Sequence, residues 1–67
     1  MMLMINGQPF HTPEDCSSMA DLLALPQWRR AMVIVELNGA VLNSRQYDGT
    51  ALTEGDCIEM VQVVGGG

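Results

Sequence analysis

The residues with the clearest chemical use are the last three of the 67-residue chain, Gly65, Gly66 and Gly67, with the carboxylate that follows them. Glycine costs roughly 0.5–1 kcal/mol relative to alanine in regular structure, so three in a row do not stabilise a sheet. Without a Cβ atom they can enter a channel too narrow for any side chain, and fully extended they reach about 10 Å. The pattern indicates a thin probe that presents a carboxylate.

That carboxylate needs activation before it can react. Its reference pKa is about 3.3–3.7, so it is ionised at neutral pH and is a poor electrophile. Adenylation by another enzyme with ATP would supply a good leaving group, and a persulfide or sulfide could then attack to leave a thiocarboxylate on Gly67. Glycine suits this step because no side chain crowds the carbonyl. The alternative interpretation is a disordered end or a cloning remnant, the usual meaning of terminal glycines.

The elements that would position the tail begin with a hairpin. Met2 to Ile5 and Gln8 to Thr12 predict two strands around Asn6-Gly7. Asn-Gly tolerates the positive φ angles of a type I′ turn, which gives this prediction a mechanism.

A short amphipathic helix is expected next. Ser18 is a good N-cap with Asp21 three residues later, and Leu22 and Leu23 follow helical spacing. The helix should end just before Pro26, because proline restricts the preceding residue and has no backbone N–H. Its leucine stripe is expected to face a sheet.

A second hairpin is predicted further along the chain. Met32 to Leu37 is rich in β-branched residues and runs into Asn38-Gly39, after which Ala40 to Leu42 resumes an apolar pattern. Asn43 to Thr50 is polar and predicts a loop with a brief helical turn around Tyr47, before another turn at residues 53–56.

The final strand is predicted to begin at Cys57. Its apolar residues occupy both faces, as in a strand sandwiched inside a sheet rather than lying at its rim. These residues are Ile58, Met60, Val61, Val63 and Val64.

The length, composition and element order limit which folds and which classes of partner are possible. The predicted element order is strand, strand, helix, strand, short strand, strand. This order predicts one α+β domain, in which one helix lies across one face of a mixed sheet. Eight acids against three bases give a formal net charge of −5, which opposes binding to a nucleic acid. The longest apolar runs have five residues, whereas a membrane-spanning helix needs about 20. We therefore expect no membrane partner and a cytoplasmic location.

Other reactive residue types form no recognisable set. Cys16 and Cys57 match neither a redox nor a metal-binding spacing, and they are expected to be core or boundary thiols. His11 lacks a cluster of further ligands, so no metal site is expected. No nucleophile, base and orienting acid stand in a catalytic pattern, and enzymatic activity is not expected.

Two surface features have open interpretations. Trp28, with Arg29 and Arg30 beside it, could contact a partner, since Trp and Arg are enriched in interface hot spots, or Trp28 could cap the core. Four acids are expected to form a solvated surface, or to steer the chain toward basic partners. They are Glu36, Glu54, Asp56 and Glu59.

Several short stretches carry a family resemblance: Ile5-Asn6-Gly7, Ala20-Asp21-Leu22-Leu23, Val35-Glu36-Leu37-Asn38-Gly39, Glu54-Gly55-Asp56, Ile58-Glu59-Met60-Val61 and Val64-Gly65-Gly66-Gly67. With them nearly the whole chain resembles the ThiS-type sulfur carriers of thiamine biosynthesis, β-grasp proteins akin to ubiquitin and to the small molybdopterin synthase subunit. The resemblance implies a β-grasp domain over residues 1–64, with a four- to five-stranded sheet, and a flexible glycine tail over residues 65–67. Asn43 to Tyr47 matches only loosely the family's usual Pro-Arg and Trp region.

The resemblance also implies a function. An E1-like adenylyltransferase of the ThiF type would adenylate Gly67 with ATP, a cysteine-desulfurase persulfide would supply sulfur, and a thiazole synthase of the ThiG type would receive it. Gly65 and Gly66 would lie in the partner's channel, and the carrier would be no enzyme and would bind no cofactor. Three alternatives stay open: a carrier for molybdopterin or another sulfur-containing metabolite, a ubiquitin-like modifier of lysines, and an interaction module with an inert tail.

Overall fold

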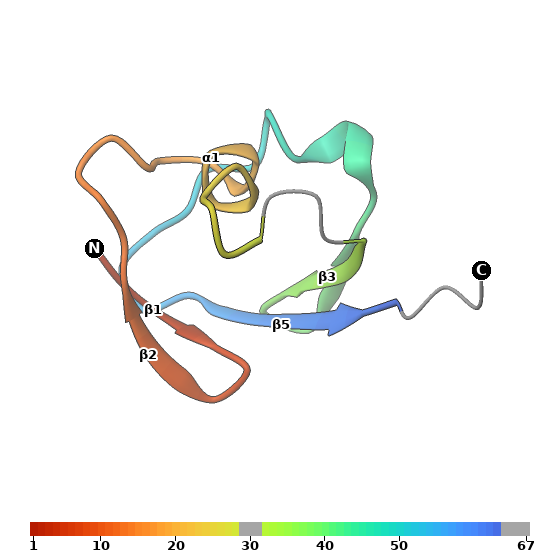
Figure 1. Cartoon of the computed structure of the whole chain (residues 1–67), viewed down its shortest axis with the longest axis horizontal. Coiled ribbons are helices and arrows are strands. Elements are labelled where there is room, and N and C mark those ends of the chain that lie inside the picture. The colour runs from red at the N-terminus through yellow and green to blue at the C-terminus, as the bar shows by residue number, and fades with distance from the viewer. Residues whose placement is uncertain (29–31, 64–67) are drawn as a thin grey trace.

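Two hairpins and a final strand build a five-stranded sheet in the computed structural model (Figure 1), which describes residues 1–28 and 32–63. The first hairpin pairs β1 (Met2–Ile5) with β2 (Gln8–His11). The second pairs β3 (Val33–Leu37) with β4 (Ala40–Leu42). Both predicted hairpins are confirmed.

The turns of the two hairpins have the geometry that Asn-Gly favours. Asn6 and Asn38 each have a φ of 51°, and the glycines after them, Gly7 and Gly39, have φ angles of 79° and 89°. Asparagine is one of the few residues with a side chain that tolerates this left-handed region. Each turn therefore closes without strain, and the strands on both sides pair in register.

The helix α1 (Met19–Leu23) begins where the sequence predicts it. The Ser18 hydroxyl accepts a hydrogen bond from the Asp21 backbone N–H, and the Asp21 carboxylate accepts one from the Ser18 backbone N–H, both at 3.1 Å. This reciprocal capping box satisfies donors that a short helix leaves unpaired. Ala24 forms the C-cap, two residues before Pro26.

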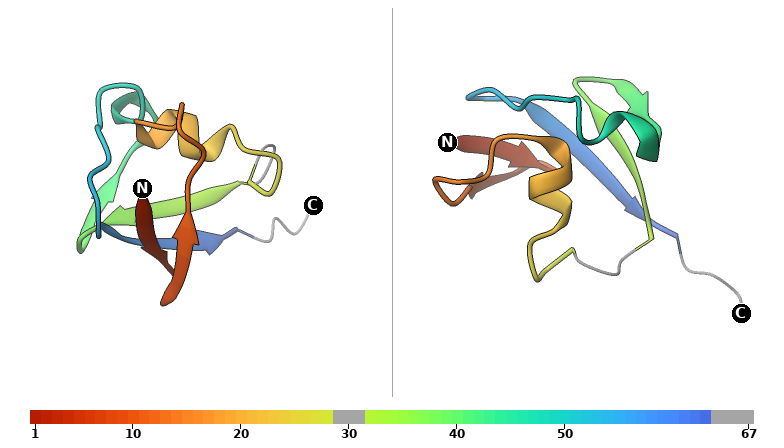
Figure 2. Two further views of the ribbon diagram at one scale, coloured as in Figure 1. Left: turned by 90° about the vertical axis from the view of Figure 1, so that its left-hand side faces the viewer. Right: turned by 90° about the horizontal axis from the view of Figure 1, so that it is seen from above.

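The strand order of the sheet is β2-β1-β5-β3-β4. The last strand, β5 (Cys57–Gln62), lies in the centre, parallel to β1 and antiparallel to β3. The helix crosses one face of this mixed sheet (Figure 2). This is the β-grasp arrangement that the resemblance implied.

The core lies between α1 and the sheet. Leu22 is fully buried and lies in one cluster with the sheet residues Ile5, Val35 and Ile58, so this leucine faces the sheet as predicted, whereas Leu23 is only half-buried at the edge. The remaining buried residues are Leu3, Cys16, Met19, Leu52 and Met60. A single 3₁₀ turn, η1 (Ser44–Gln46), is the brief helical turn expected near Tyr47.

One prediction about the last strand is only half right. The central position of β5 is confirmed, and Ile58 and Met60 are buried. Val61 and Val63 were expected to be buried as well, but their side chains are 56% and 43% exposed. The reason is that the helix covers one face of the sheet, and within residues 1–28 and 32–63 no element covers the other (Figure 2).

Candidate functional site

The predicted site residues begin three positions after the last residue of β5. Gly65, Gly66 and Gly67 lie outside the described residues, as does the predicted boundary between the domain and the tail. The structure describes the surface from which the tail departs. The Val63 N–H donates to the Met32 carbonyl at 2.8 Å, so the chain is held against the start of β3 up to residue 63.

An exposed apolar surface surrounds this departure point. Ile34 and Val61 lie directly opposite each other on β3 and β5, and they are 48% and 56% exposed. Met32 and Val63, two pairs further toward the tail on the same face, are 71% and 43% exposed. These four residues form what we call the outer apolar patch. Contiguous exposed apolar residues on a small protein mark an interaction site.

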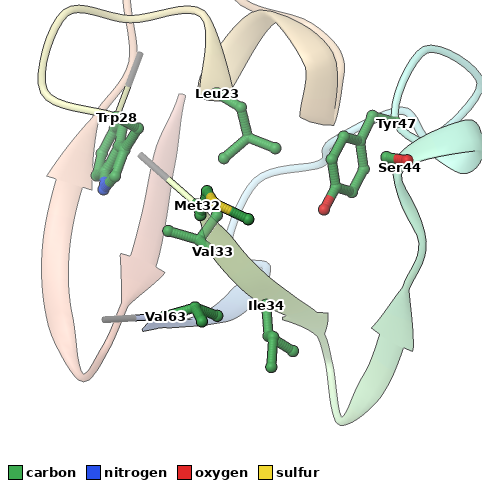
Figure 3. Close-up of a pocket in the computed structure, with 8 residues that line it drawn as sticks. All are labelled: Leu23, Trp28, Met32, Val33, Ile34, Ser44, Tyr47 and Val63. Atoms are coloured by element: carbon green, nitrogen blue, oxygen red, sulfur yellow. The ribbon is translucent and has the colours of Figure 1, made fainter. Parts of the chain in front are cut away.

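A groove of about 450 Å³ adjoins the patch (Figure 3). Leu23 reaches it from α1, Trp28 lies at one side and Tyr47 at the other, while Met32 and Val33 form its middle. The complete lining is Leu23, Trp28, Met32, Val33, Ile34, Ser44, Tyr47 and Val63. Among the described lining residues the polar side-chain groups are hydroxyl and indole groups, so the groove suits an apolar side chain of a partner better than catalysis.

Acidic groups border the patch. Glu36 and Glu59 lie directly opposite each other on β3 and β5, on the same face as Ile34 and Val61 but two pairs further from the tail. Two like charges in this position attract a cation, and the chain's net charge of −5 adds to the field. The surface around the tail is therefore apolar in its centre and negative at one side.

The strand that carries the tail is held on both sides by asparagine side chains. The Met60 N–H donates to Asn6 Oδ1 at 2.7 Å, and Asn6 Nδ2 donates to the Met60 carbonyl at 3.2 Å. On the other side, the Cys57 N–H donates to Asn38 Oδ1 at 2.9 Å. Sequence reasoning identified both turns but missed these side-chain roles, because the bonds join residues 54 and 19 positions apart.

Two of the four acids have structural roles that the sequence did not reveal. Both Glu54 carboxylate oxygens accept from the Met2 N–H at 3.1 Å. Burial raises the pKa of the Asp56 carboxyl, but hydrogen bonds from the Thr53 N–H, the Asn38 amide and the Thr53 hydroxyl outweigh it and lower the pKa below its ordinary value. Glu54 is exposed, as predicted, and Asp56 is half-buried; both side chains in addition fasten the turn before β5.

The two thiols lie in different environments. Cys16 is buried, and this burial, helped by the nearby Asp21 and Asp15 carboxylates, raises the pKa of its thiol. Cys57 is exposed at the start of β5. Both are free thiols, and in the described part of the chain no group of three or more His, Cys, Asp or Glu side chains could hold a metal ion.

Of the two roles that the sequence left open for Trp28, the structure shows that of covering the core. Its ring packs edge-on against Phe10, with centroids 5.0 Å apart and planes at 73°, and it covers the rim of the core. It also lines the groove and can contact a partner there. Arg29 and Arg30 lie outside the described residues. None of the helices in residues 1–28 and 32–63 has the length and apolar character needed to cross a membrane.

Known proteins match this chain over nearly its full length. The model of the ThiS family matches residues 3–67. The sulfur carrier protein ThiS of Bacillus subtilis is 38% identical over 66 residues, which cover 98% of this chain and all of that protein. The crystal structure of a thiamine biosynthesis protein (ThiS) from Geobacter metallireducens superposes with a TM-score of 0.81 at 36% identity and covers both chains completely. An NMR structure of a thiamine biosynthesis protein from the same organism has a TM-score of 0.75 at 38% identity, over all of this chain and 88% of that one.

Proposed function

This chain belongs to the ThiS family, and on that premise we propose a specific chemistry for a sulfur carrier of thiamine biosynthesis. An E1-like adenylyltransferase transfers AMP from ATP to the Gly67 carboxylate and releases pyrophosphate. Sulfide attack on the acyl-adenylate then expels AMP and leaves a thiocarboxylate. If the donor is a cysteine-desulfurase persulfide, the attack forms an acyl disulfide, and a second thiol must cleave its S–S bond.

The observation that carries this proposal is the extent of the family match. It runs to residue 67, so it includes the glycines on which the chemistry depends. The fold supports the same assignment, because the central strand of the sheet leads straight into that tail. Adenylation and sulfur insertion are performed by other proteins, and this chain acts as their co-substrate, with thiazole synthase as the acceptor of sulfur.

The surface around the tail serves to dock the activating enzyme. The outer apolar patch and the groove beside it present apolar area next to the departing chain. Glu36 and Glu59 favour a partner with basic side chains facing them. Because four residues at most span about 14 Å, the enzyme that reaches Gly67 must also touch the surface at Val63.

A mass spectrum of C-terminal fragments tests the chemistry. Exchange of oxygen for sulfur adds about 16 Da, nearly the mass that oxidation of one methionine adds, so intact mass does not separate them. The chain has six methionines, and the last is Met60. Fragment ions that cover residues 61–67 therefore contain none. After incubation with the adenylyltransferase, ATP and a sulfur donor, we expect the added mass on these ions alone.

Two tail variants separate the alternatives. Deletion of Gly66 and Gly67, or addition of a few residues after Gly67, should abolish ATP-pyrophosphate exchange and leave thermal unfolding unchanged. Unchanged activity in the pathway would instead identify an interaction module with an inert tail. Higher-mass conjugates that survive thiol reagents would identify a modifier of lysines. Adenylation with sulfur transfer to a molybdopterin precursor instead of a thiazole precursor would reassign the pathway.

A further inference from the structure

The main-chain groups of β5 point alternately to its two neighbours. On the β3 side, the Val63 N–H donates to Met32 and the Cys57 carbonyl accepts from Asn38, at 2.8 and 2.7 Å. The main-chain N–H and carbonyl groups of the odd-numbered residues of β5 therefore bond to β3. Those of the even-numbered residues point away from β3, as antiparallel pairing requires.

The even-numbered residues face β1, which ends before β5 does (Figure 1). The Asp56 and Ile58 carbonyls accept from β1 and its turn at 2.9 Å. The side chain of Asn6 then pairs with both main-chain groups of Met60. Gln62 is the next even-numbered residue, and its N–H and carbonyl have no partner within residues 1–28 and 32–63.

A small recess lies at this open edge. Its volume is about 160 Å³. Its lining consists of Asn6, Gln27, Trp28, Val33, Met60 and Gln62. Three of these six side chains are amides: that of Asn6 is bonded to Met60, whereas those of Gln27 and Gln62 can donate to and accept from a peptide backbone. The volume is too small for a drug-sized ligand. The site therefore suits an extended main chain.

We propose that the open edge of β5 at Gln62 is a strand-addition site for an extended segment of the adenylyltransferase. This inference rests on the proposed function. The last three residues have no side chains to recognise, so an enzyme that holds them must bond mainly to their backbone. A strand that pairs with the backbone of the tail continues naturally onto the Gln62 N–H and carbonyl, as in other strand additions to a free sheet edge.

A second copy of this chain is a poorer occupant of the same edge. Two copies each carry a formal charge of −5 and repel each other. Within the described part of the chain the open edge has a single residue, Gln62, and it offers two hydrogen bonds, too few to hold a dimer against that repulsion.

Amide hydrogen exchange of the whole protein tests the proposal. In the free protein the Gln62 amide should exchange quickly, and in the complex with its adenylyltransferase and ATP it should slow at least tenfold. The Val61 amide already faces β3 and is the internal control, slow in both states. Unchanged exchange at Gln62 in a complex that adenylates Gly67 overturns the proposal, and so does protection in the free protein that grows with its concentration.

Two substitutions give a kinetic readout. Gln62→Pro removes the side-chain amide and also a main-chain N–H that faces away from β3, a position where a strand tolerates proline. It should lower kcat/KM for adenylation about fivefold to tenfold, as expected for one main-chain hydrogen bond. Gln62→Ala removes the same side-chain amide but keeps the N–H, so its kcat/KM should fall clearly less than that of Gln62→Pro. Equal rates for the two variants overturn the strand addition, whereas a parent chain that is not adenylated at all refutes the proposed function itself.

Discussion

Replacement of Asn6 by glycine is the most direct test of how the tail-bearing strand is held. Glycine keeps the φ of 51° without strain but removes the two hydrogen bonds between the Asn6 side chain and the main chain of Met60. Each such bond contributes about 0.5–1.5 kcal/mol net. Since Asn6 is exposed, water can reach the freed groups, and we expect a loss of about 1–2 kcal/mol in the free energy of unfolding.

Urea and thermal unfolding measure this loss. In a domain of 60–100 residues, 1 kcal/mol corresponds to roughly 4–8 °C in Tm, so Asn6→Gly should melt about 5–15 °C below the parent chain. Asn6→Ala should lose about 1–2 kcal/mol more, because a Cβ atom disfavours the left-handed backbone.

A neighbouring exposed residue provides the control. Gln8 lies on the same hairpin and is exposed, and Gln8→Ala should change stability by less than about 0.5 kcal/mol. If Asn6→Gly costs no more than Gln8→Ala, the two Asn6 bonds do not hold β5, and the role assigned to this side chain is wrong.

Two further outcomes follow from the titratable groups. Hydrogen bonds lower the folded-state pKa of the Asp21 and Asp56 carboxyls below the ordinary pKa of 3.8. The two ionised carboxylates therefore stabilise the folded state above pH 3.8, and this stability is lost as the pH falls through the lowered pKa values. As the pH is lowered from about 5 to 2, the urea concentration at the midpoint of unfolding should therefore decrease less in Asp56→Asn than in the parent chain. An equal decrease in the two proteins would contradict this assignment. A thiol reagent should label the exposed Cys57 at once but the buried Cys16, whose pKa is raised, only when the protein opens; equal rates would show that Cys16 is accessible.

Local structure was predictable from the sequence because local interactions decide it. The Asn-Gly pairs determine both hairpins through their own φ preferences, and Ser18 with Asp21 specifies the start of α1 through a capping box that spans four residues. The tail was likewise visible, because the absence of side chains and the reactivity of a carboxylate are properties of residues 65–67 themselves.

Only the tertiary structure decided which surfaces those elements expose. The pattern of β5 placed it inside the sheet, but with one helix to cover two faces, Val61 and Val63 remain exposed beside the tail. The bonds of Asn6 to Met60 and the unpaired edge at Gln62 depend on where β1 ends relative to β5. These contacts join residues more than fifty positions apart, and no local preference encodes the register between strands that the chain brings together only when it folds.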